Sequence, residues 1–228
     1  MEYDVIIAGA SFGGLAVAAQ LRGLRVLLVD PEPVGAVQTS ACGTLLAVLE
    51  ATDTMPSLLQ VHERFVLHLA NRAYEVPLPD PFCTFDYRLF CRRLFAQVDA
   101  ELLPAAVLGH EGHAVHTTRG TFTGHILVDA SGWRATLASG GQHKHQPRRG
   151  VSFGLETTVP VTENGLHFWY DPGRLLPKGV TWLFPTGADS RAGIGSYTGQ
   201  TRLKTRLERW LGDTFGQHAD GLHGGYFP

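Results

Sequence analysis

Apolar and polar residues follow different periods along the chain, and the changes of period predict where strands and helices lie. Two short apolar runs, Asp4–Ala8 and Arg25–Val29, flank the alanine-rich stretch Leu15–Ala19. Apolar runs of this length are typical of buried strands, whereas the stretch between them favours a helix. The N-terminal thirty residues therefore predict a strand, a helix and a second strand.

Between residues 43 and 129 the pattern predicts two helices and two groups of strands. The expected elements are a helix that begins within 43–50, a hairpin over 65–76 that turns at Asn71-Arg72, a helix over 85–95 and a β-meander over 105–129. The meander ends in the apolar run Ile126–Asp129. This run predicts a buried strand with a carboxylate at its carboxyl end.

A polar, glycine-rich stretch from Ser139 to Gly150 separates this part from a second section. The expected elements there are strands over 151–158, 166–170, 180–184 and 193–197, followed by an amphipathic helix over 201–211. In that helix one face is apolar and contains Leu203, Leu207, Trp210 and Leu211. The second section therefore predicts an antiparallel sheet covered by a helix.

The turn after the first strand carries the sequence Gly9-Ala10-Ser11-Phe12-Gly13-Gly14. Gly9 permits a tight turn out of the strand, and Gly14 permits close packing of the helix on the sheet. Free N–H groups at the helix start can face a pyrophosphate. Asp30, twenty-one positions after Gly9, can accept hydrogen bonds from ribose hydroxyls, and Pro31 follows it at the start of a loop. This order predicts a dinucleotide-binding unit.

Ser11 departs from this motif, because a glycine is expected at its position. Its Cβ narrows the approach of the phosphates, while its hydroxyl can donate a hydrogen bond to them. The alternative interpretation of the whole segment is a glycine-rich turn in an unrelated α/β fold. We expect the dinucleotide-binding unit, because the turn follows a strand, precedes a helix and has an acid at the right distance.

A second motif lies where the meander ends, at Ile126–Asp129 followed by Ala130-Ser131-Gly132. A carboxylate at the carboxyl end of a strand lies where ligands of open α/β sheets bind. With the N-terminal unit, this motif resembles FAD-dependent oxidoreductases of the class that includes aromatic hydroxylases, geranylgeranyl reductases and flavin halogenases. The resemblance implies FAD as the cofactor, with Asp129 and Gly132 closing over the flavin. The alternative is an ordinary Asp-containing turn.

A third motif is Trp182-Leu-Phe184-Pro185, followed by Gly193-Ile-Gly195. A Trp–Phe pair at i and i+2 places both rings on one face of a strand. Gly193 and Gly195 are expected to leave room for a bulky ligand on the next strand. This resembles the signature that lines the prenyl channel of geranylgeranyl reductases, although Val180 stands where that signature begins with an aromatic residue. The motif predicts an apolar substrate pocket facing the flavin; the alternative is an ordinary aromatic core.

A further match is Ser40-Ala-Cys42-Gly43. It resembles the Cys-Gly element that lies close to the isoalloxazine in these reductases, so Cys42 is implied to lie near the flavin, where a thiol can tune the cofactor or shape the substrate site. The alternative is a buried apolar cysteine. Members of the family continue with a Gly-Asp motif and a helix that complete the pyrophosphate site. By this comparison the chain resembles the N-terminal two-thirds of a flavoprotein.

Composition narrows the partners. The formal net charge of −2 argues against a nucleic-acid binder, and there is no run of eighteen apolar residues from which to predict a transmembrane segment. Three cysteines form an odd set without a CxxC pair, so we expect a reduced, cytoplasmic protein and no structural zinc. His143 and His145 stand in a polar stretch that predicts an exposed loop and no metal site.

Together these features predict an α/β protein with a Rossmann-like FAD-binding domain that contains the inserted β-meander (1–149) and a partial antiparallel-sheet substrate domain (150–228). Residues 60–84 are expected to contribute to the second domain. The predicted activity is hydride transfer through reduced FAD to a small apolar substrate, and the resemblance points to an isoprenoid. The electron donor is expected to be NAD(P)H or a ferredoxin-like protein, and the sequence identifies no catalytic acid or base.

Two alternatives to this activity stay open. One is a flavin-dependent monooxygenase, in which reduced flavin meets oxygen. The other is a truncated, inactive fragment, because the second glycine of the N-terminal motif and the C-terminal pyrophosphate motif are both missing from the sequence.

Overall fold

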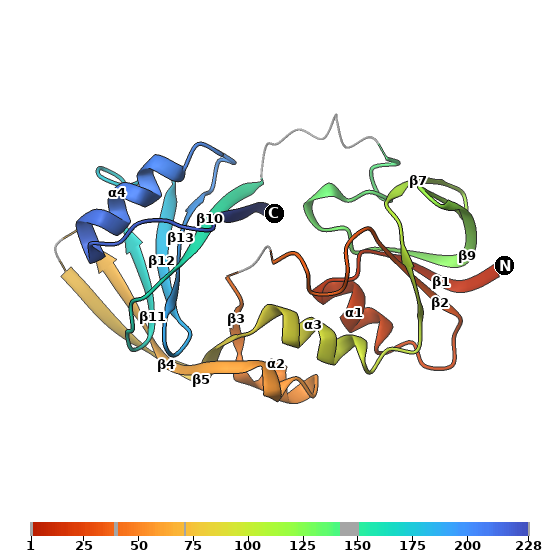
Figure 1. The fold of residues 1–228 in the computed structure, drawn as a ribbon, viewed down its shortest axis with the longest axis horizontal. Coiled ribbons are helices and arrows are strands. Elements are labelled where there is room, and N and C mark those ends of the chain that lie inside the picture. Colours follow the sequence, from red (N-terminus) through yellow and green to blue (C-terminus); the bar gives the residue numbers. More distant parts are fainter. Residues whose placement is uncertain (1, 39–40, 71, 142–150, 228) are drawn as a thin grey trace. The chain divides into compact units, whose positions relative to one another are not determined.

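The computed structural model describes residues 2–38, 41–70, 72–141 and 151–227. The chain forms two compact units, each assembled from two segments (Figure 1). Unit 1 comprises Met1–Val37 and Tyr87–Pro147, and unit 2 comprises Gln38–Asp86 and Arg148–Pro228. Residues 60–84, expected to contribute to the second domain, lie in unit 2, and so do residues 38–59 and 85–86, which the sequence assigns to the first domain.

Unit 1 is built on a six-stranded sheet in the order β6-β2-β1-β9-β8-β7. Its strands are β1 (Glu2–Ala8), β2 (Val26–Asp30), β6 (Glu101–Pro104), β7 (Val107–Glu111), β8 (Ala114–Thr117) and β9 (Gly120–Asp129). β1 pairs in parallel with β2 and β9, and β2 pairs in parallel with β6, whereas β7, β8 and β9 form an antiparallel meander. The predicted Rossmann-like fold with an inserted meander is confirmed.

The two faces of this sheet are covered differently. On one face, Gly14 of helix α1 (Phe12–Ala18) lies against Ile7, and α1 lies beside helix α3 (Tyr87–Phe95) (Figure 1). On the other face a buried apolar cluster forms, made of Tyr3, Ile6, Ala8, Leu27, Val29, Ala105, Val115 and Leu137. A short 3₁₀ turn, η2 (Gly132–Arg134), follows β9.

One part of the strand prediction in unit 1 is wrong. We expected the strand over 126–129 to be buried, but Ile126 is 58% exposed and the three residues after it are half-buried. The register explains the difference. Ile126 pairs with Val5 on the face where α1 lies, and α1 contacts β1 and β2, so the side chain of Ile126 stays accessible to solvent.

Unit 2 is built on an eight-stranded sheet in the order β14-β10-β13-β12-β11-β4-β5-β3. Its strands are β3 (Gly43–Leu45), β4 (Leu58–Leu69), β5 (Arg72–Phe85), β10 (Ser152–Val159), β11 (Leu166–Tyr170), β12 (Gly179–Pro185), β13 (Ser190–Ser196) and β14 (His223–Phe227). All neighbours pair antiparallel except β4 and β11, which are parallel. The predicted antiparallel-sheet domain is confirmed.

Helix α4 (Lys204–Phe215) covers one face of this sheet (Figure 1). The helix predicted over 201–211 begins only at Lys204, so Leu203 is its N-cap residue. The four apolar residues predicted on the inner face are all buried: Leu203, Leu207, Trp210 and Leu211. The predicted hairpin is present as β4 and β5, although Asn71 at its turn lies outside the described residues. Pro185 ends β12 as expected.

The start of unit 2 differs from the prediction. Where we expected a helix to begin within 43–50, Gly43–Leu45 forms β3 and only Leu46–Ala51 is helical, as α2. Gly43 and Thr44 are weak helix formers, and this segment pairs with β5 instead of joining the helix. A 3₁₀ turn, η1 (Met55–Ser57), then leads into β4.

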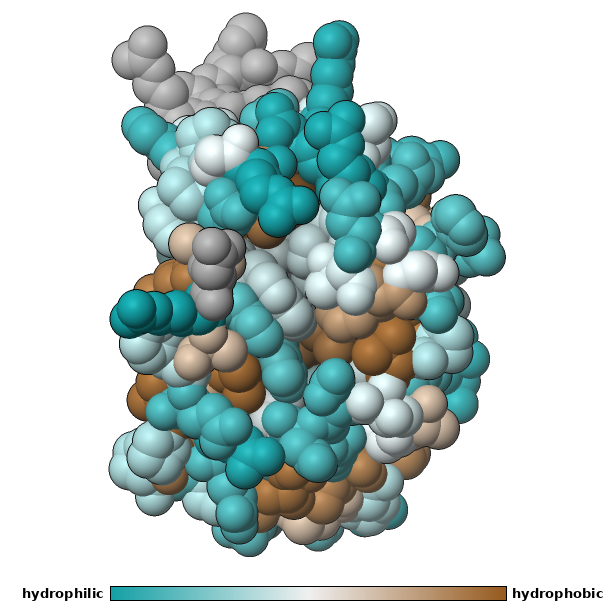
Figure 2. Space-filling model, turned by 90° about the vertical axis from the view of Figure 1, so that its left-hand side faces the viewer, coloured by the Kyte–Doolittle hydropathy of each residue, from teal (hydrophilic) through white to brown (hydrophobic). Residues whose placement is uncertain are grey.

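The surface of unit 2 is mixed in character. Figure 2 shows the side that lies at the left of Figure 1, and the hydrophobic surface there lies in separate areas between hydrophilic side chains. Scattered exposed apolar residues of this kind are ordinary for a folded protein. Among the residues that the structure describes, none of the helices has the length and apolar character needed to span a membrane.

Candidate functional site

The glycine turn of unit 1 is shaped by two close backbone approaches. A Cβ on Gly9 would collide with the carbonyl oxygen of Ala130, and one on Gly14 would collide with the carbonyl oxygen of Gly9. Gly9 also has φ of +106°, which side-chain-bearing residues rarely adopt. At Gly13 the nearest described atom to such a Cβ, that of Ala130, lies 4.0 Å away. Gly9 and Gly14 are therefore required by the fold, and Gly13 leaves open space above the turn.

Asp30 ties this turn to the end of β2. Its Oδ2 accepts a hydrogen bond from the N–H of Ala10 at 2.8 Å, and its Oδ1 accepts one from the N–H of Glu32 at 2.9 Å. A carboxylate has about four acceptor positions, so each oxygen keeps capacity for a further donor. Asp30 is half-buried and Pro31 beside it is exposed. The predicted acceptor for a ribose thus also orients the backbone of the turn.

Ser11 and Phe12 both connect α1 to α3. The hydroxyl of Ser11 lies 3.0 Å from the hydroxyl of Tyr87 and forms a hydrogen bond with it. The ring of Phe12 packs edge-on against Tyr87 and Phe90, with ring centroids 5.1 and 5.4 Å away. The Ser11 hydroxyl is therefore directed at Tyr87, and only its Cβ bears on the approach to the turn.

Asp129 lies beside the same turn, because β9 pairs with β1 and the N–H of Ala130 donates to Ala8 at 2.8 Å. Its Oδ1 accepts the N–H and hydroxyl of Ser131, and its Oδ2 accepts the N–H groups of Leu137 and Ala138. Burial raises the pKa of this carboxyl, but the Ser131 hydroxyl and the three N–H donors outweigh burial and lower the pKa overall.

Four donors fill the acceptor positions of the Asp129 carboxylate. Its role in this structure is to fold the loop that follows β9, in which Gly132 has φ of +67°. The structure thus brings Gly9, Asp30 and Asp129 together at the carboxyl edge of three parallel strands. Asp30 and Asp129 both hold backbone segments there through hydrogen bonds.

An apolar cavity of about 450 Å³ lies in unit 2. Trp182 and Phe184 line it, and strand register places both on the face of the sheet opposite α4, since the alternate residues Thr181 and Leu183 are buried on the α4 side. Its other aromatic walls are Phe168, Tyr197 and Phe227. The two rings of the third sequence motif therefore line a cavity in this structure.

The two glycines of this motif have different surroundings. Gly195 lines the cavity, but the space beside Gly193 is filled by the indole of Trp182, its cross-strand partner. The expectation that Gly193 leaves room for a ligand is wrong for this reason: the missing side chain makes room for Trp182 itself. A Cβ on Gly195 would lie 3.2 Å from Cζ3 of the same indole. Gly193 and Gly195 therefore both leave space that the indole of Trp182 packs against.

Two polar residues that the sequence did not single out lie at the edge of this cavity. Trp182 Nε1 donates a hydrogen bond to Glu156 Oε2 at 2.8 Å, and His223 Nε2 lies 3.1 Å from Glu156 Oε1. The hydrogen bond to Glu156 raises the pKa of His223 above its ordinary value, and partial burial opposes this. Glu156 itself is only 4% exposed.

A sequence signal for Glu156 existed but was weak. Glu156 is the one charged residue in the strand predicted over 151–158, and a charge within a strand needs hydrogen-bond partners if it is buried. His223 lies in the glycine-rich end of the chain, where we predicted no strand. Its place beside Glu156 follows from the pairing of β14 with β10.

Cys42 lies in unit 2 and is fully buried, with φ of +55°. Its neighbour Ala41 lines the apolar cavity, and a Cβ on Gly43 would lie 3.4 Å from Phe184. Arg191 Nη1 donates to the carbonyl oxygens of Ala41 and Phe85, each at 3.1 Å. The segment that carries the Cys-Gly element is therefore part of the cavity wall, while Ser40 lies outside the described residues.

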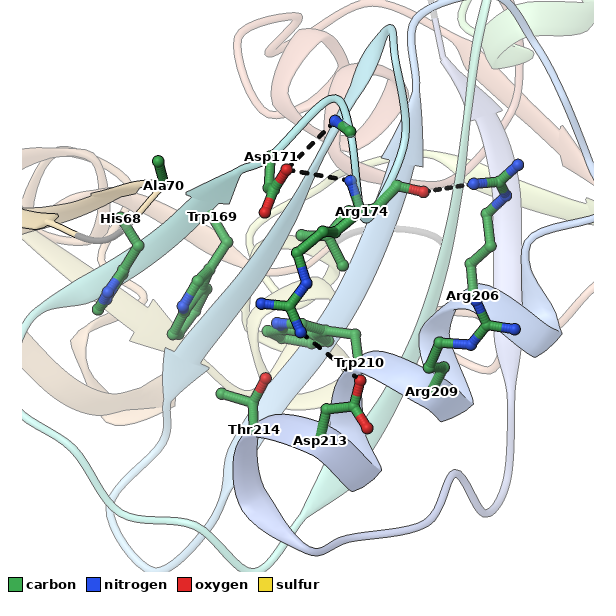
Figure 3. A pocket seen from close by; sticks show the side chains of 12 residues that line it. His68, Ala70, Trp169, Asp171, Arg174, Arg206, Arg209, Trp210, Asp213 and Thr214 are labelled. Carbon is green, nitrogen blue, oxygen red and sulfur yellow. Dashed lines mark hydrogen bonds and ion pairs between the residues drawn. The ribbon is translucent and has the colours of Figure 1, made fainter.

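A second, polar cavity of about 530 Å³ lies on the α4 side of the same sheet (Figure 3). Arg206 Nη1 donates to the carbonyl of Leu175 at 2.6 Å, and Arg174 lies 4.0 Å from Asp213. The ring of His68 stacks on Trp169 with centroids 4.1 Å apart. Both side chains of the Arg174–Asp213 ion pair are exposed, so the pair contributes little to the free energy of folding. This cavity was not predicted from the sequence.

Among the described residues, no group of three or more His, Cys, Asp or Glu side chains is placed to hold a metal ion. His143 and His145, for which the sequence predicted an exposed loop, lie outside the described residues.

No family model matches the chain, and no curated protein matches it. Solved structures do match. A geranylgeranyl bacteriochlorophyll reductase-like protein from Thermoplasma acidophilum superposes with a TM-score of 0.83 at 19% identity, covering 99% of this chain and 66% of that chain. The flavin-dependent brominase Bmp2 superposes with a TM-score of 0.74 at 13% identity, covering 99% and 67%. The chain shares the fold of these two proteins.

A third match belongs to the same group of folds. PqsL, a probable FAD-dependent monooxygenase from Pseudomonas aeruginosa, superposes with a TM-score of 0.64 at 17% identity, covering 92% of this chain and 66% of that chain. At these identities the likeness concerns the fold, and it confirms the resemblance drawn from the sequence motifs. The chain spans about two thirds of the length of these solved chains.

Proposed function

We propose that this chain is an FAD-dependent oxidoreductase that transfers hydride through reduced FAD to a small apolar substrate of the isoprenoid type. The observation that carries the proposal is the glycine turn of unit 1, held by Asp30 at the carboxyl edge of a parallel sheet. The likeness in fold to the geranylgeranyl bacteriochlorophyll reductase-like protein supports it. The three buried cysteines, none in a disulfide in the described chain, suit the reducing cytoplasm.

The residues of the turn fit FAD. Gly13 is exposed and leaves space above the turn for phosphates, and the backbone N–H groups there are suited to an anion. Asp30 has acceptor capacity left on both oxygens after binding Ala10 and Glu32. Gly9, Ala10, Gly13 and Gly14 would hold the pyrophosphate, and Asp30 would accept the ribose hydroxyls.

FAD, when bound, supplies the hydride chemistry, and the protein supplies binding and orientation. Trp182, Phe184 and Phe168 provide apolar walls that exclude water and favour a hydrocarbon substrate. We propose Asp129 and Gly132 as residues that shape the cofactor site through the loop after β9, whereas Cys42, which lies in unit 2, is proposed as a cofactor residue from the family resemblance alone. The electron donor is proposed to be NAD(P)H or a ferredoxin-like protein.

A flavin-dependent monooxygenase is the second candidate, and the likeness in fold to PqsL favours it. The two activities differ in their need for oxygen. Product analysis with a reduced cofactor, under air and under nitrogen, separates them: a reductase forms product in both atmospheres, and a monooxygenase forms it only under air.

The first test of the proposal is the visible absorption spectrum of the purified chain after incubation with FAD and removal of free cofactor. We expect a retained flavin band and saturable quenching of flavin fluorescence in a titration. A spectrum without a flavin band, together with no saturable quenching, would contradict FAD binding and support the third interpretation, a folded fragment without the cofactor.

A further inference from the structure

We propose that the apolar cavity of unit 2 binds a ligand that carries one hydroxyl group, and that the carboxylate of Glu156 accepts the hydrogen bond from this hydroxyl. This inference rests on the proposed function, because it specifies the substrate class of the same cavity. The ligand is then an apolar alcohol or phenol rather than a pure hydrocarbon.

The first observation is the contrast between Glu156 and its surroundings. The cavity walls are mainly aromatic rings and glycines, and Glu156 is the one carboxylate among the described residues that line it. Its side chain is more than nine-tenths buried. A buried charge is costly unless hydrogen bonds satisfy it, so a carboxylate at this position calls for donors.

The second observation is the capacity of that carboxylate. Within the described chain, Oε2 accepts one hydrogen bond, from Trp182, and Oε1 accepts one, from His223. Since a carboxylate has about four acceptor positions, two stay available on a group that water scarcely reaches. A donor brought in by the ligand would fill one of them. A ligand without a donor would instead leave this acceptor position of Glu156 without water and without a hydrogen bond.

The third observation concerns charge. His223 already stands beside Glu156 at ion-pair distance. When His223 is protonated, an ammonium group on the ligand would add a second positive charge next to it, whereas a hydroxyl adds a donor without a charge. The geometry therefore favours a neutral donor, and the hydroxyl is the neutral donor that an otherwise apolar molecule most simply carries.

The experiment compares three probes of one carbon skeleton: geraniol, its methyl ether and geranylamine. Binding to the full chain is measured by isothermal titration calorimetry, with and without FAD. We expect geraniol to bind roughly tenfold to a hundredfold more tightly than the ether, because a hydrogen bond to a buried charge is at stake. This comparison needs only the wild-type protein.

Two variants then locate the acceptor. In Glu156→Gln the preference for geraniol over the ether should shrink severalfold, because a neutral amide is a weaker acceptor. The matched control is Glu208→Gln, at a partly exposed glutamate of α4 on the opposite face of the sheet, and it should keep the wild-type preference. Circular dichroism verifies that both variants are folded.

The outcomes separate the inference from the proposed function. Equal affinity for geraniol and the ether overturns the inference and leaves the apolar site standing. Tightest binding of geranylamine also overturns it, in favour of a cationic ligand. If none of the three probes binds, the apolar substrate site of the proposed function falls, and the inference falls with it. A preference for geraniol that survives in Glu156→Gln assigns the acceptor elsewhere and overturns the role of Glu156.

Discussion

The indole of Trp182 occupies the space that a side chain of Gly193 would fill on the neighbouring strand. This relationship decides what the cavity of unit 2 presents to a ligand. With Gly193 beneath it, the indole can lie close to the sheet while its Nε1 reaches Glu156. Gly193 and Trp182 therefore depend on each other, and replacing either residue alone disturbs the packing of the pair.

Gly193→Ala should destabilise unit 2, because the new Cβ collides with the indole of Trp182. Overpacking of this kind typically costs about 1–3 kcal/mol. Urea denaturation measures the change in the free energy of unfolding. The control is Gly212→Ala in α4, where a Cβ meets no described atom within 4 Å. That variant should gain up to about 1 kcal/mol, and equal stability of the two variants would contradict the role of Gly193.

Asp30→Ala should weaken FAD binding, because the ribose loses a charged acceptor and the N–H of Ala10 loses the partner that orients the turn. Loss of a hydrogen bond to a charged group is worth about 1.5–3 kcal/mol. Titration of both proteins with FAD, followed by flavin fluorescence, measures the effect. An unchanged dissociation constant would show that the ribose binds elsewhere.

Ser11→Gly should bind FAD at least as tightly as the wild type, because it removes the Cβ that narrows the phosphate approach. The change also removes the hydrogen bond to Tyr87. Tyr87→Phe is the matched control, since it removes that hydrogen bond and keeps the Cβ of Ser11. A large loss of affinity in Ser11→Gly alone would show that the serine hydroxyl is itself a phosphate ligand.

The His223–Glu156 contact should make stability depend on pH. Glu156 raises the pKa of His223, while burial and the charge of Arg191 oppose it. A raised pKa in the folded state means that the contribution is fully present below the ordinary value of 6.5 and is lost as pH rises through the folded pKa. Urea denaturation of wild type and His223→Gln from pH 5 to pH 9 measures the difference in their free energies of unfolding. This difference should decrease as the pH rises. A difference independent of pH would refute this account.

Asp129→Asn should destabilise unit 1 by about 1–3 kcal/mol at neutral pH, because an amide cannot satisfy all four donors that the carboxylate accepts. The lowered pKa of Asp129 has the opposite pH consequence to that of His223. Its stabilisation is present above the ordinary value of 3.8 and is lost as pH falls through the folded pKa. The difference in stability between wild type and Asp129→Asn should therefore be smaller at acid pH. Thermal unfolding of both proteins at pH 7 and pH 3 measures this difference.

The sequence predicted those parts of the fold in which local pattern and tertiary pairing agree. The strand–helix–strand start, the meander and the inner face of α4 all have strong periodicity, and the structure contains each of them. The pattern failed where long-range pairing decides. Gly43–Leu45 becomes a strand because it pairs with β5, and His223–Phe227 becomes one because it pairs with β10.

The residues of the candidate site also differ in whether a local motif or long-range strand pairing places them. Gly9 and Asp30 belong to a motif with fixed spacing, so the sequence could indicate them directly. Glu156 and His223 are sixty-seven residues apart and meet only through the register of two strands. The sequence also could not show that the space beside Gly193 belongs to Trp182, because that depends on which residue stands opposite it.

The discontinuous make-up of both units has a consequence for how the chain folds during synthesis. The central strand β1 is made first, but its neighbour β9 emerges more than a hundred residues later, and β4 likewise waits for β11. Until then the edge of β1 that faces β9 and the edge of β4 that faces β11 offer unpaired backbone groups to other chains. Pairings so distant in sequence fold slowly. A nascent chain of this kind has a long interval in which aggregation competes with folding, and that interval closes for unit 2 only once β10 to β14 have left the ribosome.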